Sequence, residues 1–231
     1  MNTSRLAGRR ITLTLAALIA TGSMMVVLAV SDAHEGHAAT EHHANHHATA
    51  QTTKQAALHD GMRGLWEQHV TWTRLAIVSF AADLPDLQAT EQRLLRNQVD
   101  IGNAIKPYYG KAAGNKLTAL LKEHITGAVA LLDAAKSGDD ARTAEAKRAW
   151  YANGRQVADF LSGANPHNWP RAEMRKMMKT HLDQTLKEAV DQLTGKYAAG
   201  VREYDAIERH IIDMADMLSS GIIAQFPGRF R

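Results

Sequence analysis

A histidine recurs along this chain at nearly constant intervals, each time within sequence of helical character. The three copies are separated by 55 and 57 residues and are His69, His124 and His181. A second polar position follows each copy after 28 or 29 residues, at Asn97, Asn153 and His210. An internal repeat limits the architectures open to a chain, because each repeat is one supersecondary unit that buries its apolar face against its neighbours. The spacing therefore predicts three helical hairpins of similar build.

The apolar residues of 59–231 are spaced three and four positions apart, which predicts helices and no sheet. Short turns interrupt this pattern, and helices joined by short turns pack as antiparallel neighbours. We therefore expect an all-α fold, a six-helix bundle built from three pseudo-repeated antiparallel αα-hairpins. The expected helices lie near 61–82, 88–106, 112–136, 140–162, 170–193 and 198–225.

The first 33 residues have the character of an export signal. Three arginines precede an apolar, uncharged run at 11–30, and Ser31-Asp32-Ala33 offers a cleavage site of small residues. Residues 1–33 are therefore predicted to be a signal peptide. The alternative is an N-terminal membrane anchor, because about 20 apolar residues can span a bilayer. Either interpretation predicts an exported, periplasmic or extracytoplasmic protein, which touches the membrane only if the run stays uncleaved.

Residues 34–58 combine small and polar residues with an unusual density of histidine. This composition offers little to bury, so the segment is expected to be disordered. Six of its histidines fall within fourteen residues, at His34, His37, His42, His43, His46 and His47. Neutral imidazole is a good ligand for Cu and Zn, so we predict that this segment captures a transition metal ion. The alternative is a solvated linker whose histidines are incidental.

The repeated polar residues are expected to form one layer across the bundle. A rotation of 100° per residue puts the three histidines on apolar helix faces, and equal counts from a turn mean equal height in an antiparallel hairpin. The predicted sets are His69 with Asn97 and Asp100, His124 with Asn153 and Gln156, and His181 with His210 and Asp213. Buried polar groups must be hydrogen-bonded or ligated. Two of the histidines face amides, which favours structural pairing.

A metal or small-ligand site within the bundle is the competing interpretation of this layer. Its best candidates are His181, His210 and Asp213, where two imidazoles and a carboxylate coincide. Five methionines accompany them, and thioether with imidazole is a ligand set for Cu(I). These methionines are Met174, Met177, Met178, Met214 and Met217. The simpler interpretation is that flexible methionines fill gaps in the core.

Several function classes find no support in the sequence. Residues 1–33 hold +2 of the net charge of +3, so the remainder carries only +1, and no basic patch with aromatics indicates nucleic-acid binding. Cysteine is absent, which excludes disulfides and thiolate metal sites. No Gly-rich phosphate loop, Gly-x-Ser-x-Gly elbow or paired Glu-x-x-His motif occurs. We therefore predict no catalytic residue and favour a non-enzymatic role.

Six stretches between residues 65 and 231 resemble a bacterial all-helical family of undetermined function. They are LWEQHVTWTRLAI, RLLRNQVDIGNAIKPYYG, LTALLKEHI, RAWYANGRQVADFL, ANPHNWP and GIIAQFP. Bacillus-type members carry transferred names such as glycosyltransferase or acetylglutamate kinase, activities that need α/β folds. The resemblance thus implies a helical fold and no established chemistry. We expect an exported helical-bundle protein that binds Cu or Zn mainly through its His-rich segment; the alternative is a structural or small-ligand-binding helical module.

Overall fold

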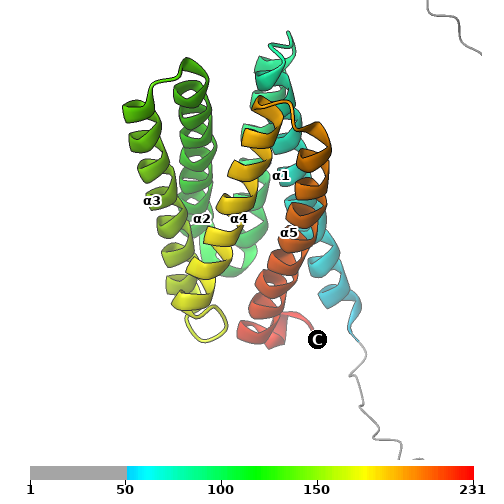
Figure 1. Cartoon of the computed structure of the whole chain (residues 1–231). Coiled ribbons are helices and arrows are strands. Elements are labelled where there is room, and N and C mark those ends of the chain that lie inside the picture. Colours follow the sequence, from blue (N-terminus) through cyan, green and yellow to red (C-terminus); the bar gives the residue numbers. More distant parts are fainter. Residues whose placement is uncertain (1–50) are drawn as a thin grey trace, which may run out of the picture. The chain divides into compact units, whose positions relative to one another are not determined.

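The computed structural model of this chain describes residues 51–231, and the expected signal segment and the six histidines of 34–47 lie outside the described residues. Within 51–231 the protein is helical and has no strand, so the all-α prediction is confirmed. The elements in order are α1 (Thr53–Ala81), α2 (Leu87–Ser137), α3 (Asp140–Ala164), α4 (Arg171–Leu193), α5 (Tyr197–Gln225) and the short 3-10 helix η1 (Pro227–Arg229) (Figure 1).

Helix α2 contains both of the helices expected at 88–106 and 112–136. It is broken at Gly110, whose φ of 84° and ψ of 167° are not helical. The two parts of α2 then pack against each other, because a Cβ built on Gly102 would lie 2.6 Å from the carbonyl oxygen of Gly114. Twelve residues of straight helix would span about 18 Å. The described part of the chain thus has five α-helices, where six were expected, and the second folds back on itself at Gly110.

The helices contact one another in a closed ring. α1 packs on α2, α2 on α3, α3 on α4, α4 on α5 and α5 on α1. Two turns depend on glycine with positive φ: Gly138 has φ 71° at the end of α2, and Gly195 has φ 73° between α4 and α5. This conformation strains residues that carry a Cβ. The core inside the ring includes Trp66, Leu117, Val157, Leu182, Ile211 and Ile222.

The first helix starts earlier than expected and is tied to the C-terminus. Thr52 caps α1 in a reciprocal pair of hydrogen bonds with Gln55. Its hydroxyl also donates to the carbonyl oxygen of Phe230 at 2.8 Å. Residues 53–58, expected to be disordered, therefore form the first turns of α1, because these contacts hold them.

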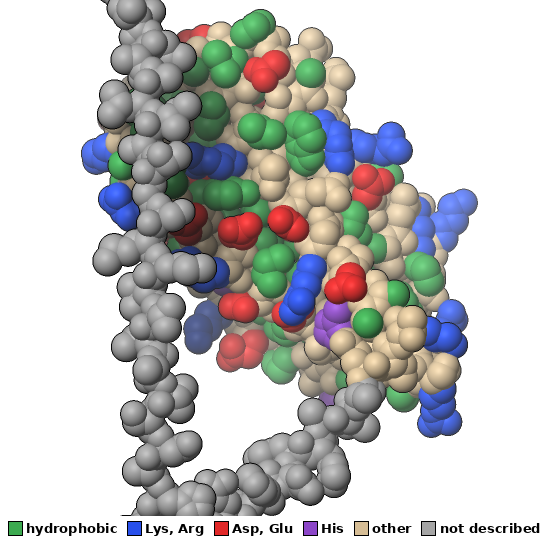
Figure 2. Space-filling view, turned by 90° about the vertical axis from the view of Figure 1, so that its right-hand side faces the viewer, with side chains coloured by type: hydrophobic (Ala, Val, Ile, Leu, Met, Phe, Trp, Pro, Cys, Tyr) green, Lys and Arg blue, Asp and Glu red, His purple; other side chains and the backbone are tan. Residues whose placement is uncertain are grey.

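The surface formed by α1 and α5 carries charges of both signs (Figure 2). Acidic side chains are spread over the middle of this face, with basic side chains among and beside them. Among residues 51–231, no helix is both long and apolar enough to cross a membrane.

Candidate functional site

The three repeated histidines meet in the core of the bundle. They come from α1, the second part of α2, and α4, and we call His69, His124 and His181 the histidine cluster. The ring centres of His69 and His181 are 5.6 Å apart, and those of His124 and His181 are 6.3 Å apart. Each side chain is at most 5% exposed. The near-constant spacing in the sequence therefore assembles one buried cluster from three helices.

Burial keeps the histidine cluster neutral. Loss of solvation lowers the pKa of His69 to about 3, with a smaller contribution from the nearby His124. It lowers the pKa of His124 to about 4, against a hydrogen bond to Asn153 that raises it. The pKa of His181 also lies well below its usual value, first because of burial and then because of the other histidines. Neutral imidazoles can pack together in the core without repulsion.

His124 is paired with Asn153, as expected. Its Nδ1 lies 3.1 Å from Asn153 Oδ1. The amide nitrogen of Asn153 donates to the carbonyl oxygen of Leu120 at 3.1 Å, so Oδ1 is the acceptor and His124 Nδ1 carries the proton. Gln156, expected in the same set, is exposed. The ring of Trp150 stacks on His124 with centres 5.2 Å apart.

The partner of His69 is Gln98 rather than Asn97. Gln98 Nε2 lies 3.2 Å from His69 Nδ1, and the Gln98 side chain is fully buried. Asn97 is also buried but donates to the carbonyl oxygen of Leu65 at 3.0 Å. Asp100 lies at the edge of the core, 3.6 Å from Arg96. The prediction of Asn97 and Asp100 as partners of His69 is therefore wrong, because the longer amide one position later reaches the ring.

His181, His210 and Asp213, proposed as metal ligands in the bundle, do not form a set of three ligands in the described part of the chain. His210 Nε2 bonds the carbonyl oxygen of Met177 at 3.0 Å, and Asp213 is exposed. His181 Nδ1 is buried and has no hydrogen-bond partner among residues 51–231. In the same part of the chain, no group of three or more His, Asp or Glu side chains is arranged to hold a metal ion. The five methionines near these residues all belong to the core or pack against it.

A hydrogen bond of one kind recurs three times around the histidine cluster. In each case a side chain at the second polar position donates to a backbone carbonyl four residues before a cluster histidine. The donors and acceptors are Asn97 and Leu65 at 3.0 Å, Asn153 and Leu120 at 3.1 Å, and His210 and Met177 at 3.0 Å. A helical carbonyl has a second lone pair for such a bond. The second polar positions thus link paired helical segments through the backbone.

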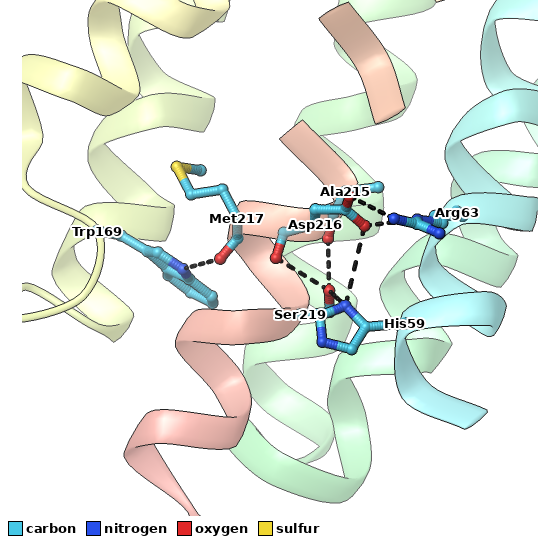
Figure 3. Close-up of polar contacts among 7 residues, drawn as sticks. All are labelled: His59, Arg63, Trp169, Ala215, Asp216, Met217 and Ser219. Atoms are coloured by element: carbon cyan, nitrogen blue, oxygen red, sulfur yellow. Dashed lines mark hydrogen bonds and ion pairs between the residues drawn. The ribbon is translucent and has the colours of Figure 1, made fainter. Parts of the chain in front are cut away.

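Ser219, His59 and Asp216 have the composition of a hydrolytic triad but not its geometry (Figure 3). Ser219 Oγ lies 2.6 Å and Asp216 Oδ1 3.8 Å from the same atom, His59 Nδ1. A triad needs serine and carboxylate on opposite ring nitrogens. The hydroxyl also lies 2.8 Å from the carbonyl oxygen of Ala215, and Asp216 binds Arg63 through two 2.6 Å contacts. These residues therefore link α1 to α5 and do not activate a nucleophile.

A second buried ionisable group lies between α1 and α4. Glu188 is 1% exposed, and its Oε1 lies 2.5 Å from Arg74 Nη1. Burial raises the pKa of Glu188 to about 7, while Arg74 opposes the rise. The Arg74 guanidinium also lies 5.1 Å from the ring centre of Tyr204. No sequence motif marks this pair, since the two residues are 114 positions apart.

The histidine cluster and the contacts of Ser219 with His59 therefore hold helices together. The histidine cluster is closed to solvent, and the Ser219 hydroxyl is engaged with backbone oxygens. General acids and bases need access to a substrate proton. Comparison with known proteins adds no constraint: no family model, no curated protein and no solved structure matches this chain.

Proposed function

We propose that this is an exported, non-catalytic helical-bundle protein that captures a Cu or Zn ion with the histidines of residues 34–47. The observation that carries the proposal is the density of imidazoles, six within fourteen residues. Several nearby imidazoles on a solvated segment can adjust to the geometry that a given metal prefers. Residues 1–33 would direct export, and the bundle would carry the metal-binding segment.

The state of the histidines in the bundle supports the assignment of the metal ligands to the segment. The cluster histidines are at most 5% exposed. His210 bonds a backbone oxygen, and His59 bonds the Ser219 hydroxyl. A metal ion would have to displace these contacts and open the core. The composition of residues 34–47 predicts imidazoles that are available without that cost.

We also propose that the bundle consists of three pseudo-repeated αα-hairpins and six helical segments. Two observations support this arrangement. The hydrogen bond to the carbonyl four residues before each cluster histidine recurs three times, at 3.0, 3.1 and 3.0 Å. The reversal at Gly110 divides α2 between the first and second hairpins. The residues that resemble an all-helical bacterial family fall within this bundle.

Metal titration of three proteins tests the capture function. These are the full chain, a variant with all six histidines of 34–47 changed to alanine, and residues 48–231, which form a compact unit that begins before the α1 cap. Each is titrated with Cu(II), Cu(I) and Zn(II) against a competing chelator. Binding by the full chain alone would support the proposal. Equal binding by residues 48–231 would move the site into the bundle, and binding weaker than micromolar in all three would overturn metal capture.

A second candidate function, a small-ligand-binding helical module, is favoured by a separate observation. A cavity of about 360 Å³ opens between α3 and α4. Cavities that hold small ligands typically measure about 300–1,000 Å³.

A further inference from the structure

The cavity between α3 and α4, which we call the α3–α4 groove, has an apolar floor. Met178 and Leu182 of α4 form it together with Gly154 of α3. All three are buried, and a Cβ built on Gly154 would lie 2.9 Å from Leu182 Cδ2. The close approach of the two helices at Gly154 therefore leaves side chains of α4 as the floor of the groove. Such a floor favours the apolar part of a ligand.

The rim of the groove is cationic. Arg155, Arg175, Lys176 and Lys179 line it, and a neighbouring cavity of about 480 Å³ adds Lys147 and Arg148. The two cavities share Tyr151 and Arg155, and every charged residue that lines either one is basic. This local density of positive charge stands out because residues 34–231 together carry a net charge of only +1.

Carboxylates close to the groove neutralise only part of this charge. Asp159 binds Arg175 at 2.7 Å, and Asp183 binds Lys179 at 2.6 Å. Among residues 51–231, no ion pair is formed by Arg155 or Lys176, and both are exposed. Arg155 lines the groove from α3 and Lys176 from α4, and both are exposed to solvent. The hydrogen bond from Arg175 has the larger effect in lowering the pKa of the Asp159 carboxyl group, and Arg155 also lies close enough to help lower it.

Another face of the bundle has the opposite balance. The cavity of about 390 Å³ on α1 and α5 is lined by Glu67, Glu208 and Asp213 with a single cation, Arg209. This is the face on which Figure 2 shows acidic side chains spread over the middle. The cationic rim is therefore a local property of α3 and α4.

We propose that the α3–α4 groove binds a single-chain anionic amphiphile, with its hydrocarbon chain on Met178 and Leu182 and its headgroup between Arg155 and Lys176. Charge complementarity selects the anion, and the apolar floor selects the chain. A polar anion of the size of inorganic phosphate would leave the floor unused. A neutral amphiphile would leave the cations unused. Carboxylate and phosphate headgroups share the chemistry that this rim recognises. This site is independent of metal capture by residues 34–47.

Calorimetric titration of the full chain tests the groove with four probes. Dodecanoate and dodecyl phosphate, used below their micelle-forming concentrations, supply the two anionic headgroups. Dodecyl maltoside supplies the chain without charge, and inorganic phosphate supplies charge without the chain. We expect at least one anionic amphiphile to bind tenfold or more tightly than either of the last two. The preferred headgroup identifies the source of the ligand. Equal affinity for dodecyl maltoside or inorganic phosphate would overturn the proposal.

A pair of charge-reversal variants locates the binding. Arg155→Glu with Lys176→Glu changes two exposed cations of the rim, and we expect at least tenfold weaker binding of the amphiphile. Lys116→Glu with Lys122→Glu makes the same charge change at exposed positions of α2 and should leave the affinity unchanged. Both variants keep the apolar run 11–30, so any amphiphile bound there cancels. Equal affinity of the two folded variants, verified by circular dichroism, would overturn the assignment to the groove.

Discussion

Acidification should lower the free energy of unfolding of this bundle through its histidine cluster. The loss should begin well above the pKa values that these histidines have in the folded protein. Burial lowers the pKa of His69 to about 3 and that of His124 to about 4, whereas an unfolded chain has a histidine pKa of about 6.5. Protonation therefore favours the unfolded state. The stability that depends on these neutral rings is lost progressively as the pH falls from about 6.5 toward about 4 for His124 and about 3 for His69.

The size of the loss follows from the two pKa values. At pH 5 the folded rings are still neutral, since the pKa values of His69 and His124 are about 3 and 4. In the unfolded chain the histidine pKa is about 6.5, so pH 5 lies about 1.5 units below it. Each unit favours the protonated form by about 1.4 kcal/mol. Each histidine therefore costs about 2 kcal/mol on going from pH 8 to pH 5. His181 acts in the same direction. Typical domains are stable by only about 5–15 kcal/mol.

Glu188 opposes this trend and must be separated from it. Burial raises the pKa of Glu188 to about 7, so its carboxyl group gains a proton more readily in the folded protein. Its contribution to stability therefore improves as the pH falls from above 7 toward its unfolded value of about 4.5. The pH dependence of the wild-type chain is the sum of both effects.

The variant His124→Gln isolates one cluster histidine. Glutamine keeps an amide donor for Asn153 Oδ1 but does not titrate. Urea unfolding followed by circular dichroism at pH 8 and pH 5 should show a loss on acidification that is about 2 kcal/mol smaller than in the wild type. Glu188 contributes equally to both proteins and cancels. His167→Gln, at an exposed position, is the matched control and should behave as the wild type. Equal losses in the wild type and His124→Gln would refute the reasoning.

Three further substitutions test packing, charge and backbone. Gly221→Ala would bring a Cβ to 2.8 Å from Trp169 Cε2, so we expect a loss of about 1–3 kcal/mol in urea unfolding. Arg74→Met leaves the buried Glu188 without its cation and should cost about 3 kcal/mol at pH 8. The cost should shrink at pH 5, where Glu188 is protonated. Gly110→Ala forces a side chain into φ 84°, which should cost about 1–3 kcal/mol of unfolding free energy.

One control variant serves the two glycine predictions. Gly64→Ala adds a Cβ to α1 where nothing lies within 4 Å, and alanine is the better helix former. It should be neutral or slightly stabilising in the same urea experiment. If Gly221→Ala matched this control, the Trp169 contact would not limit the packing of α5. If Arg74→Met lost equal stability at pH 5 and pH 8, the cost would come from packing rather than from charge on Glu188.

The sequence was sufficient to locate the buried histidines but not all of their partners. Apolar spacing predicted the core faces of three helices, and the structure has His69, His124 and His181 there. Asn97 and Gln98 differ by about 100° in direction around the helix, and the glutamine side chain is longer by one methylene group. Counting residues from a turn cannot decide which of the two reaches His69. Gln98 does follow the apolar stripe, four residues after Leu94, and that position was the available signal.

The remaining features depend on tertiary structure. The Ser219–His59 contact joins residues 160 positions apart, and the groove combines cations from two helices. Neither leaves a local pattern in the chain. The link expected between the helices at 88–106 and 112–136 is helical as far as Tyr109, although it contains Pro107. Proline removes one backbone donor and often ends a helix, but here the interruption comes at Gly110, where only glycine suits the conformation.

If residues 34–47 capture a metal ion as proposed, metal release and loss of bundle stability should begin in the same pH range, although they involve different histidines. Imidazole ligands of residues 34–47 would be lost as the pH falls through about 6.5, because protonation competes with the metal. The histidine cluster begins to destabilise the bundle at that pH too, since the unfolded-state pKa sets the onset. Acid release alone would therefore not identify the ligands. The variant without the six segment histidines separates the two: it should lose metal binding at every pH and keep the acid sensitivity of the wild-type bundle.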